Sequence, residues 1–328
     1  EAERILNDLI VRFGARGGSV IVQNPNTGKI VAMGNAPSFD PNRYGEYPIA
    51  TFLNRAVEQA YEPGSVFKVI TMASAIDAGK ITPNTTFYDS GVLEVSGKKI
   101  RNWDLKAHGT VTMTNVIEES LNTGAAFVES RLGNVAFRDY VTQFGFGDKT
   151  GINLPGEISG SLRSLGNKAP QIAFSSASFG QGVSGTPLQL ISAVGAIANG
   201  GMLMRPSLDA TVAPEAVRRV ISEDAARKVT AMMVSAVDKA EVARVSGFSI
   251  AGKTGTAQVA DLTNGGYLED TYINTYVGFA PASKPQFIIL LKLDRPDGAP
   301  LAGTTVVPAF RELAQFLLNY YSVAPDRP

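Results

Sequence analysis

A long apolar stretch between Pro63 and Gly79 constrains the fold more than any other part of the sequence. Pro63 suits the first turn of a helix and Gly79 its end, so the pattern predicts one helix over this stretch. Because its residues are apolar nearly all round, the helix must be buried inside a larger structure. Ser65 and Lys68 lie near its start, three positions apart, and therefore share one face of the helix.

A lysine beside a serine in such a helix can act as a base. Burial removes the hydration of the Lys68 ammonium, which lowers the pKa of the amine and favours its neutral form. Neutral lysine can then take the proton of the Ser65 hydroxyl and activate the serine as a nucleophile. The alternative is a helix-capping serine beside a surface lysine, because the S-x-x-K pattern is short. A second copy, Ser96-Gly97-Lys98-Lys99, lies in a Gly/Lys turn without an apolar helix to bury its lysine.

Two further polar motifs follow along the chain. Ser120-Leu121-Asn122 comes after one helical stretch and before another, so we expect both polar side chains on a connecting loop. Lys253-Thr254-Gly255-Thr256 lies in a strand-like segment. In that segment, Gly252 and Gly255 are expected to leave room for another backbone, such as that of a bound substrate.

The last of these motifs also has a second copy, Lys149-Thr150-Gly151. Its neighbours on both sides are turn formers and not strand formers. A motif of this kind needs its structural context, so the strand copy at Lys253 is predicted to be the functional one.

Strand patterns gather at the two ends of the chain and helix patterns in the middle. The predicted strands cover residues 19–23, 29–33, 249–259, 275–280 and 286–293, and short connections between them imply antiparallel pairing. Predicted helices lie at the N-terminus, at Ser65, around Val116 and over residues 125–132, 188–199, 225–236 and 310–320. The sequence therefore predicts an α+β fold, with one antiparallel sheet and a separate helical lobe. The cleft between them would hold Ser65, Ser120 and Lys253.

Composition argues against several other kinds of site. The 328 residues include no cysteine, which excludes a thiol nucleophile, disulfides and thiolate metal ligands. The single histidine, His108, lies in a loop, and one histidine supports neither a Ser-His-Asp triad in this setting nor a zinc site. Thirty basic and 30 acidic residues cancel, so electrostatics suggest no nucleic-acid partner. The longest apolar run, residues 287–291, is far shorter than the roughly 20 residues of a membrane span.

The three motifs, in this order, resemble those of the transpeptidase domain of class B penicillin-binding proteins. The resemblance covers nearly the whole chain. It includes a first hairpin at residues 17–33, the loop at 39–42 and the segments at 178–182 and 186–189. The strand at 276–282 and the helix start at 308–310 resemble the division-type, penicillin-binding protein 2/3-like branch.

For the fold, the resemblance implies a five-stranded antiparallel sheet flanked by helices, an all-helical lobe, and an active site in the cleft between. Residues 1–328 would form a single transpeptidase domain, with an α/β lobe from roughly 1–60 and 240–328 and a helical lobe from roughly 61–239. The chain starts directly in an amphipathic helix, which suggests that the membrane anchor and pedestal domain usual in the family are missing from it. The complete protein is expected at the cytoplasmic membrane, with this domain on the periplasmic side.

For the chemistry, the resemblance implies a peptidoglycan D,D-transpeptidase. Ser65 would attack the carbonyl of the penultimate D-alanine of a stem peptide, with Lys68 as base and Ser120 as a proton relay. The implied substrate-binding residues are Asn122, Lys253, Thr254, Gly255 and Thr256, and the backbone N–H groups of Ser65 and Thr256 would form an oxyanion hole.

The implied reaction needs no cofactor and no metal. An amine of a second stem peptide would accept the acyl group, and β-lactams would block Ser65. A glycosyltransferase and membrane proteins of cell division or elongation are the protein partners that the resemblance implies, with septal cell-wall synthesis as the setting.

Three alternatives remain open at this stage. A D,D-carboxypeptidase would pass the acyl group to water, and a serine β-lactamase would hydrolyse its acyl-enzyme rapidly. That hydrolysis needs a base, for which Glu157 is a candidate, although a glutamate after a Pro-Gly turn commonly just fixes the loop. A penicillin-binding sensor or an idle cell-wall scaffold is the non-enzymatic alternative. The three intact motifs argue against an idle scaffold.

Overall fold

The computed structural model of the protein describes residues 1–261, 263–298 and 301–328. At its centre lies a five-stranded antiparallel sheet in the order β2-β1-β11-β10-β9, which makes β9 an edge strand. The strands are β1 (Gly17–Gln23), β2 (Ile30–Ala36), β9 (Ala251–Ala260), β10 (Tyr267–Ala280) and β11 (Phe287–Asp294). The predicted sheet and its α+β fold are confirmed, although β10 begins well before the expected residue 275.

The middle strand β11 shows why this sheet is covered on both faces. All of its residues are buried, and alternate side chains point to opposite faces. Ile289 and Leu291 pack in one apolar cluster, whereas Ile288 and Leu290 belong to another. The sheet therefore separates two hydrophobic cores.

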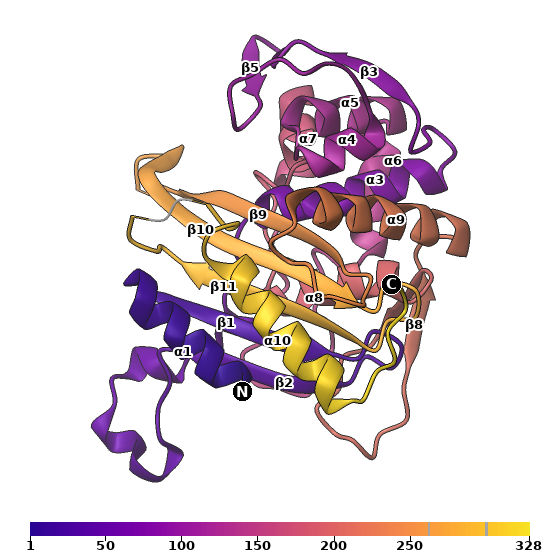
Figure 1. Cartoon of the computed structure of the whole chain (residues 1–328). Coiled ribbons are helices and arrows are strands. Elements are labelled where there is room, and N and C mark those ends of the chain that lie inside the picture. Colours follow the sequence, from indigo (N-terminus) through magenta and orange to yellow (C-terminus); the bar gives the residue numbers. More distant parts are fainter. Residues whose placement is uncertain (262, 299–300) are drawn as a thin grey trace.

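Two helices from the ends of the chain cover the first face. They are α1 (Ala2–Phe13) and α10 (Val306–Tyr320), which lie close together over the sheet (Figure 1). The predicted amphipathic pattern of α1 is confirmed, because Ile5, Leu6 and Leu9 are buried. The exposed Val11 lies on its other side.

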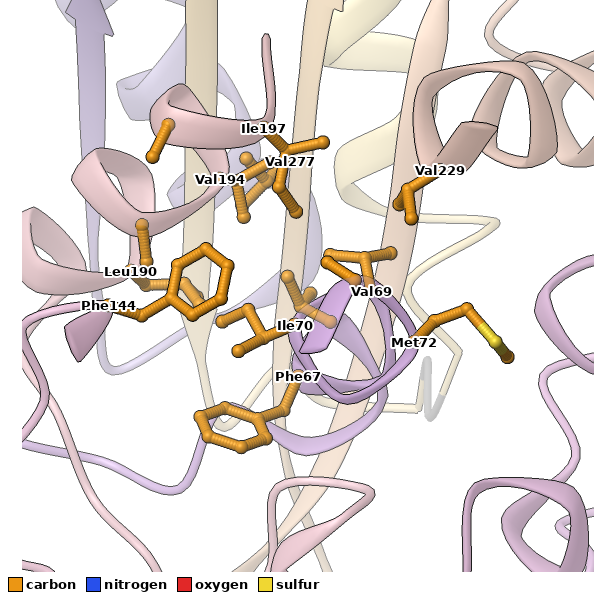
Figure 2. Close-up of a cluster of buried hydrophobic side chains, with 14 of the residues drawn as sticks. Phe67, Val69, Ile70, Met72, Phe144, Leu190, Val194, Ile197, Val229 and Val277 are labelled. Atoms are coloured by element: carbon orange, nitrogen blue, oxygen red, sulfur yellow. The ribbon is translucent and has the colours of Figure 1, made fainter. Parts of the chain in front are cut away.

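Helices from the middle of the chain form the second core. They are α2 (Arg55–Glu58), α3 (Lys68–Asp77), α4 (Met113–Glu118), α5 (Asn122–Leu132), α6 (Asn134–Gln143), α7 (Gln171–Ala177), α8 (Pro187–Ala198) and α9 (Glu223–Ala240). Of these, α2, α8 and α9 contact the sheet, and α4 to α7 pack on other helices. Helix α3 is buried on all sides, as predicted. Figure 2 shows its residues Val69 and Ile70 in one apolar cluster with Leu190 of α8, Val229 of α9 and Val277 of β10.

Several short elements were not predicted. Among the described residues they include helices α2, α6 and α7, three 3-10 helices and three two-stranded ribbons, whereas a fourth 3-10 helix, η3 (Gly64–Phe67), forms the start of the helix predicted at Ser65. The other 3-10 helices are η1 (Pro41–Glu46), η2 (Ile49–Phe52) and η4 (Arg163–Leu165). The ribbons pair β3 (Thr86–Asp89) with β6 (Gly109–Thr112), β4 (Val92–Val95) with β5 (Lys98–Arg101), and β7 (Met202–Met204) with β8 (Ala216–Arg219). In the described ranges, no helix has the length and apolar character needed to cross a bilayer.

Candidate active site

Ser65 lies in a tight turn that is packed against the edge strand of the sheet. The turn is η3, which continues directly into α3, so the predicted helix begins with a 3-10 turn and Pro63 precedes it. Gly64 adopts the left-handed conformation with φ of 56°, where a side chain would be strained. A Cβ atom at Gly64 would also lie 3.0 Å from the Cβ atom of Ala257 on β9. The backbone around Ser65 therefore approaches the strand closely.

The glycines of the third motif serve this close approach. A Cβ atom at Gly255 would lie 2.8 Å from the carbonyl oxygen of Pro63 and 2.9 Å from Val66 Cγ2. At Gly252 it would overlap the Tyr276 ring, 2.0 Å from the hydroxyl oxygen. The prediction that these glycines leave room for another backbone is thus confirmed at Gly255, but that backbone is the Ser65 turn and not a substrate, and at Gly252 the neighbour is the Tyr276 ring.

Lys68 is the first residue of α3 and is almost fully buried, with 1% of its surface exposed. Its Nζ atom donates to the carbonyl oxygen of Ser120 and to Ser120 Oγ at 3.1 Å. Over the described residues, no hydrogen bond joins Lys68 Nζ to Ser65 Oγ. The direct pairing expected from the helical spacing is therefore not formed, and the Lys68 amine binds Ser120 instead. Burial, and secondly the charge of Lys253, hold the pKa of Lys68 well below its ordinary value.

Ser120 connects α4 to α5 in a strained conformation. Its φ is 56°, in a region that non-glycine residues rarely adopt. Such strain persists where surrounding contacts fix the residue, and it is typical of functional sites. Here, the contacts come from Lys68 and from Lys253 Nζ, which donates to Ser120 Oγ at 2.9 Å. Ser120 Oγ thus lies between two lysine amines.

Asn122, the other polar residue of the second motif, is the first residue of α5 and does not lie on the connecting loop. The expected loop position is wrong because α5 starts three residues before the predicted start at residue 125. Asn122 Nδ2 donates to the carbonyl oxygen of Arg101 at 2.8 Å, which ties β5 to the start of α5.

Lys253 and Thr254 are adjacent on β9, and Thr256 lies two positions after Thr254. Lys253 is 4% exposed, and burial lowers its pKa to about 7. Its Nζ atom also donates to the carbonyl oxygen of Thr254 at 3.2 Å. Side chains alternate along a strand, so Thr254 and Thr256 share the face that lines the cleft. Thr256 Oγ1 accepts a hydrogen bond from the backbone N–H of Ala302 at 3.1 Å and keeps its own proton free to donate.

These residues surround one cleft of about 840 Å³. Five of the predicted site residues line it, namely Ser65, Ser120, Asn122, Thr254 and Thr256. Lys68 and Lys253 lie beneath its surface and reach Ser120 Oγ from opposite sides of the cleft. The structure therefore brings the three motifs together.

The cleft also contains residues that sequence reasoning set aside or missed. Lys98 and Lys99, from the discarded S-x-x-K copy, line it together with Arg101 and Trp103. Ser96, the serine of that copy, lies in the β4–β5 turn with φ of 51°. A signal was present in the sequence, since three basic residues and the single tryptophan occur within six positions.

The other candidate residues lie in structural contacts. Glu157 is buried and accepts hydrogen bonds from the backbone N–H groups of Thr150 at 2.7 Å and Gly151 at 3.2 Å, and from the Thr150 hydroxyl. It therefore fixes the loop that contains the second K-T-G copy. His108 is half-buried and its Nε2 lies 3.0 Å from a carboxylate oxygen of Asp104. Across the described ranges, no group of three or more His, Cys, Asp or Glu side chains could hold a metal ion.

Comparisons with known proteins agree on the family to which this chain is similar. Residues 18–315 match the family model described as the penicillin-binding protein transpeptidase domain. Stage V sporulation protein D of Bacillus subtilis is 35% identical over 99% of this chain and 52% of its own length. The probable peptidoglycan D,D-transpeptidase PenA of Neisseria flavescens is 32% identical over 98% of this chain and 80% of its own.

Solved structures agree. Penicillin-binding protein 3 from Mycobacterium tuberculosis, complexed with aztreonam, has a TM-score of 0.89 and 30% identity over 100% of this chain and 78% of that one. The TP domain of Burkholderia pseudomallei penicillin-binding protein 3 has a TM-score of 0.87 and 28% identity, over 99% of this chain and 94% of that one.

The fold thus matches that of penicillin-binding protein transpeptidase domains. The chain belongs to the penicillin-binding protein transpeptidase family, in its class B branch. It spans about half the length of several of the curated relatives that it matches.

Proposed function

We propose that this protein is a peptidoglycan D,D-transpeptidase that forms a covalent acyl-enzyme on Ser65. The observation that carries the proposal is the position of Ser120 Oγ between Lys68 Nζ and Lys253 Nζ in the cleft that Ser65 lines. A hydroxyl held between two buried amines is suited to moving protons, and a serine beside it is suited to nucleophilic attack.

The first half of the reaction transfers an acyl group to Ser65. Ser65 Oγ bonds to the carbonyl carbon of the penultimate D-alanine, and the C–N bond to the terminal D-alanine breaks. Neutral Lys68 receives the serine proton, and the low pKa that burial gives this amine supports that role. Ser120 then passes a proton to the leaving amine. Lys68 is already hydrogen-bonded to Ser120, which supports this relay.

Substrate binding uses the opposite wall. The hydroxyls of Thr254 and Thr256 bind the terminal carboxylate, and Lys253 supplies positive charge beneath them. Asn122 holds the amide side chain of the substrate. The backbone N–H groups of Ser65 and Thr256 stabilise the oxyanion, in keeping with the close packing of the Ser65 turn on β9.

The second half of the reaction decides between related enzymes. A transpeptidase passes the acyl group to an amine of a second stem peptide, whereas a carboxypeptidase or a β-lactamase passes it to water. Fast hydrolysis needs a base that activates water. Glu157, the candidate from the sequence, has both carboxylate oxygens engaged in the Thr150-Gly151 loop, which disfavours the β-lactamase alternative.

The biological setting is inferred from relatives and from the substrate. Relatives are named for sporulation and for peptidoglycan transpeptidation, and we place this protein in septal or other cell-wall synthesis. Its substrate lies outside the cytoplasmic membrane, so the complete protein would work on that side, beside a glycosyltransferase and membrane partners. Residues 1–60 and 240–328 would form the α/β lobe of a single domain, and residues 61–239 the helical lobe.

A penicillin-labelling experiment tests the proposal. Intact-mass measurement after incubation with penicillin should show one adduct that lasts many minutes in the wild-type protein and in Ser96→Ala. Ser65→Ala should show none. A donor substrate ending in D-Ala-D-Ala, offered together with an amine acceptor, should give crosslinked product. Labelling of Ser65→Ala would refute the site. Rapid turnover of penicillin that Glu157→Gln abolishes would make the protein a β-lactamase.

A further inference from the structure

The proposed reaction requires the cleft to hold two peptides that each carry a carboxylate. Lys253, Thr254 and Thr256 provide one carboxylate site, on the β9 wall, for the donor. The acceptor is itself a stem peptide, and its carboxylate needs a second cationic surface within reach of Ser65. The following inference rests on the proposed function and concerns the opposite wall of the same cleft.

That wall is formed by the hairpin of β4 and β5 together with Trp103, which we call the basic ribbon. Lys98, Lys99 and Arg101 are exposed and all line the cleft. Across the part of the chain that the structure describes, none of the three forms an ion pair, although Glu94 lies opposite Lys99 in the hairpin register. Trp103 has 60% of its surface exposed and adds an apolar face. Long cations beside an aromatic ring suit a peptide that carries a carboxylate.

Other acidic groups near the basic ribbon are already engaged. Glu118 and Glu119 also line the cleft, but both form ion pairs with Lys239. Glu118 accepts further hydrogen bonds from Asn115 and Ser235. These carboxylates therefore do not neutralise the lysines of the ribbon.

The basic ribbon is fixed to the segment that carries Ser120. Asn122 Nδ2 donates to the carbonyl oxygen of Arg101 at 2.8 Å, and Trp103 Nε1 donates to the carbonyl oxygen of Glu119 at 3.0 Å. Both bonds flank Ser120 in sequence. A peptide held on the ribbon would therefore keep a constant position relative to the Ser120 hydroxyl.

We propose that the basic ribbon is the acceptor subsite, where Lys98, Lys99 and Arg101 bind the carboxylate of the acceptor peptide and Trp103 contacts its apolar part. The acceptor amine then attacks the ester carbonyl of the Ser65 acyl-enzyme. A C–N bond forms, the C–O bond to Ser65 breaks, and the amine proton passes through Ser120 and Lys68 to Ser65 Oγ. The net result is an amide crosslink and the free serine.

Acceptor selectivity tests the inference. Two amine peptides are compared as acceptors with a thioester donor, one with a free C-terminal carboxylate and one amidated at that end. The measured quantity is the ratio of aminolysis to hydrolysis as the acceptor concentration rises. The combined variant carries Lys98→Ala, Lys99→Ala and Arg101→Ala. In it, the concentration of free-carboxylate peptide that gives the wild-type ratio should rise about 5- to 10-fold, as the loss of a few exposed ion pairs predicts. The amidated peptide should change little.

Controls separate this inference from the proposed function. Lys284→Ala, in the exposed β10–β11 turn, removes a lysine far from the cleft and should behave as wild type. Penicillin acylation and donor hydrolysis report the Ser65 chemistry alone, so failure of both in the wild-type protein refutes the proposed function. Two results would overturn the acceptor subsite while acylation stays normal. One is an unchanged ratio of aminolysis to hydrolysis in the combined variant, and the other is an equal loss for both peptides.

The single tryptophan gives a direct binding signal. Trp103 is the one tryptophan of the chain, so fluorescence excited selectively at tryptophan, and not at the ten tyrosines, reports on the basic ribbon. Titration with the free-carboxylate peptide should give a saturable change in fluorescence that weakens at high salt and in the combined variant. A titration without any change up to the concentration that half-saturates aminolysis would contradict the proposal.

Discussion

Lys253 Nζ on the edge strand β9 donates a hydrogen bond to Ser120 Oγ at 2.9 Å, which joins the sheet to the helical part of the molecule across the cleft. Lys68 Nζ reaches the same oxygen at 3.1 Å from α3. Two like charges that share one hydroxyl in a buried site repel each other, and burial disfavours both. The arrangement therefore favours one neutral and one charged lysine, which is the pair that base catalysis and carboxylate binding need.

The pH dependence of acylation should show this division of roles. The pKa of Lys68 lies well below its ordinary value, so the fraction of neutral base, and the rate, rise as pH increases through it. The pKa of Lys253 is about 7, so above neutral pH its charge is lost and carboxylate binding weakens. The second-order acylation rate for penicillin should therefore fall on the alkaline side.

The methyl ester of the same penicillin is the matched control, because it has no carboxylate. Its profile between pH 5 and 9 should lack the alkaline fall. Because the amines of Lys68 and Lys253 interact, the rise and the fall of the pH–rate profile each report the pair and not one residue. An alkaline fall of equal size for the ester would show that Lys253 does not act through the carboxylate.

Lys68→Met should separate catalysis from stability. It removes the base and should lower the acylation rate by about 10³-fold, within the range for general bases. Burial disfavours the amine, but its loss also removes the donor to the Ser120 carbonyl oxygen, so these opposing effects should leave the melting temperature little changed. Stopped-flow acylation and thermal unfolding measure the two effects. A variant that melts normally and acylates at the wild-type rate would remove Lys68 from the mechanism.

The elements that sequence predicts well are those with strong local patterns. The apolar stretch of α3 and the buried strand β11 follow from hydrophobic periodicity alone. The starts of helices were harder to predict where no capping residue marks them. Leu121, Gly133 and Pro170 precede α5, α6 and α7, and none of them provides a side-chain cap. This explains why α5 was predicted to start too late and why α6 and α7 were missed.

Within the site, the residue types were predictable but their contacts were not. Ser120 bridges Lys68 and Lys253, which lie far apart in the chain. Gly255 is required by its close contact with Pro63, which is also far away in sequence. No local pattern encodes such pairs. The basic ribbon escaped notice because β4 and β5 are four residues each and mostly exposed, which gives a weak strand signal.

Thr254→Val and Thr150→Val compare the two K-T-G copies directly. Thr254 lines the cleft, so loss of its hydroxyl should slow acylation by roughly 10-fold or more, as expected for one hydrogen bond to a charged group. Thr150 Oγ1 donates to Glu157, so its loss should lower the melting temperature and leave the acylation rate unchanged. Equal losses of rate in both variants would contradict the assignment of the strand copy.

Gly255→Ala tests whether the Ser65 turn depends on its contact with β9. The added Cβ atom would lie 2.8 Å from the Pro63 carbonyl oxygen, which is backbone and cannot move aside cheaply. Overpacking of this kind typically costs about 1 to 3 kcal/mol, and here it would push the turn away from the strand that carries Thr254 and Thr256. We expect acylation to slow by at least about 10-fold, because displacement of a nucleophile by a fraction of an ångström is enough to misalign it.

Gly45→Ala, at a site with nothing within 4 Å and no positive φ, is the control and should acylate normally. Acylation kinetics and thermal unfolding of the two variants give the comparison, and an unchanged rate in folded Gly255→Ala would show that the Ser65 turn does not need this close contact.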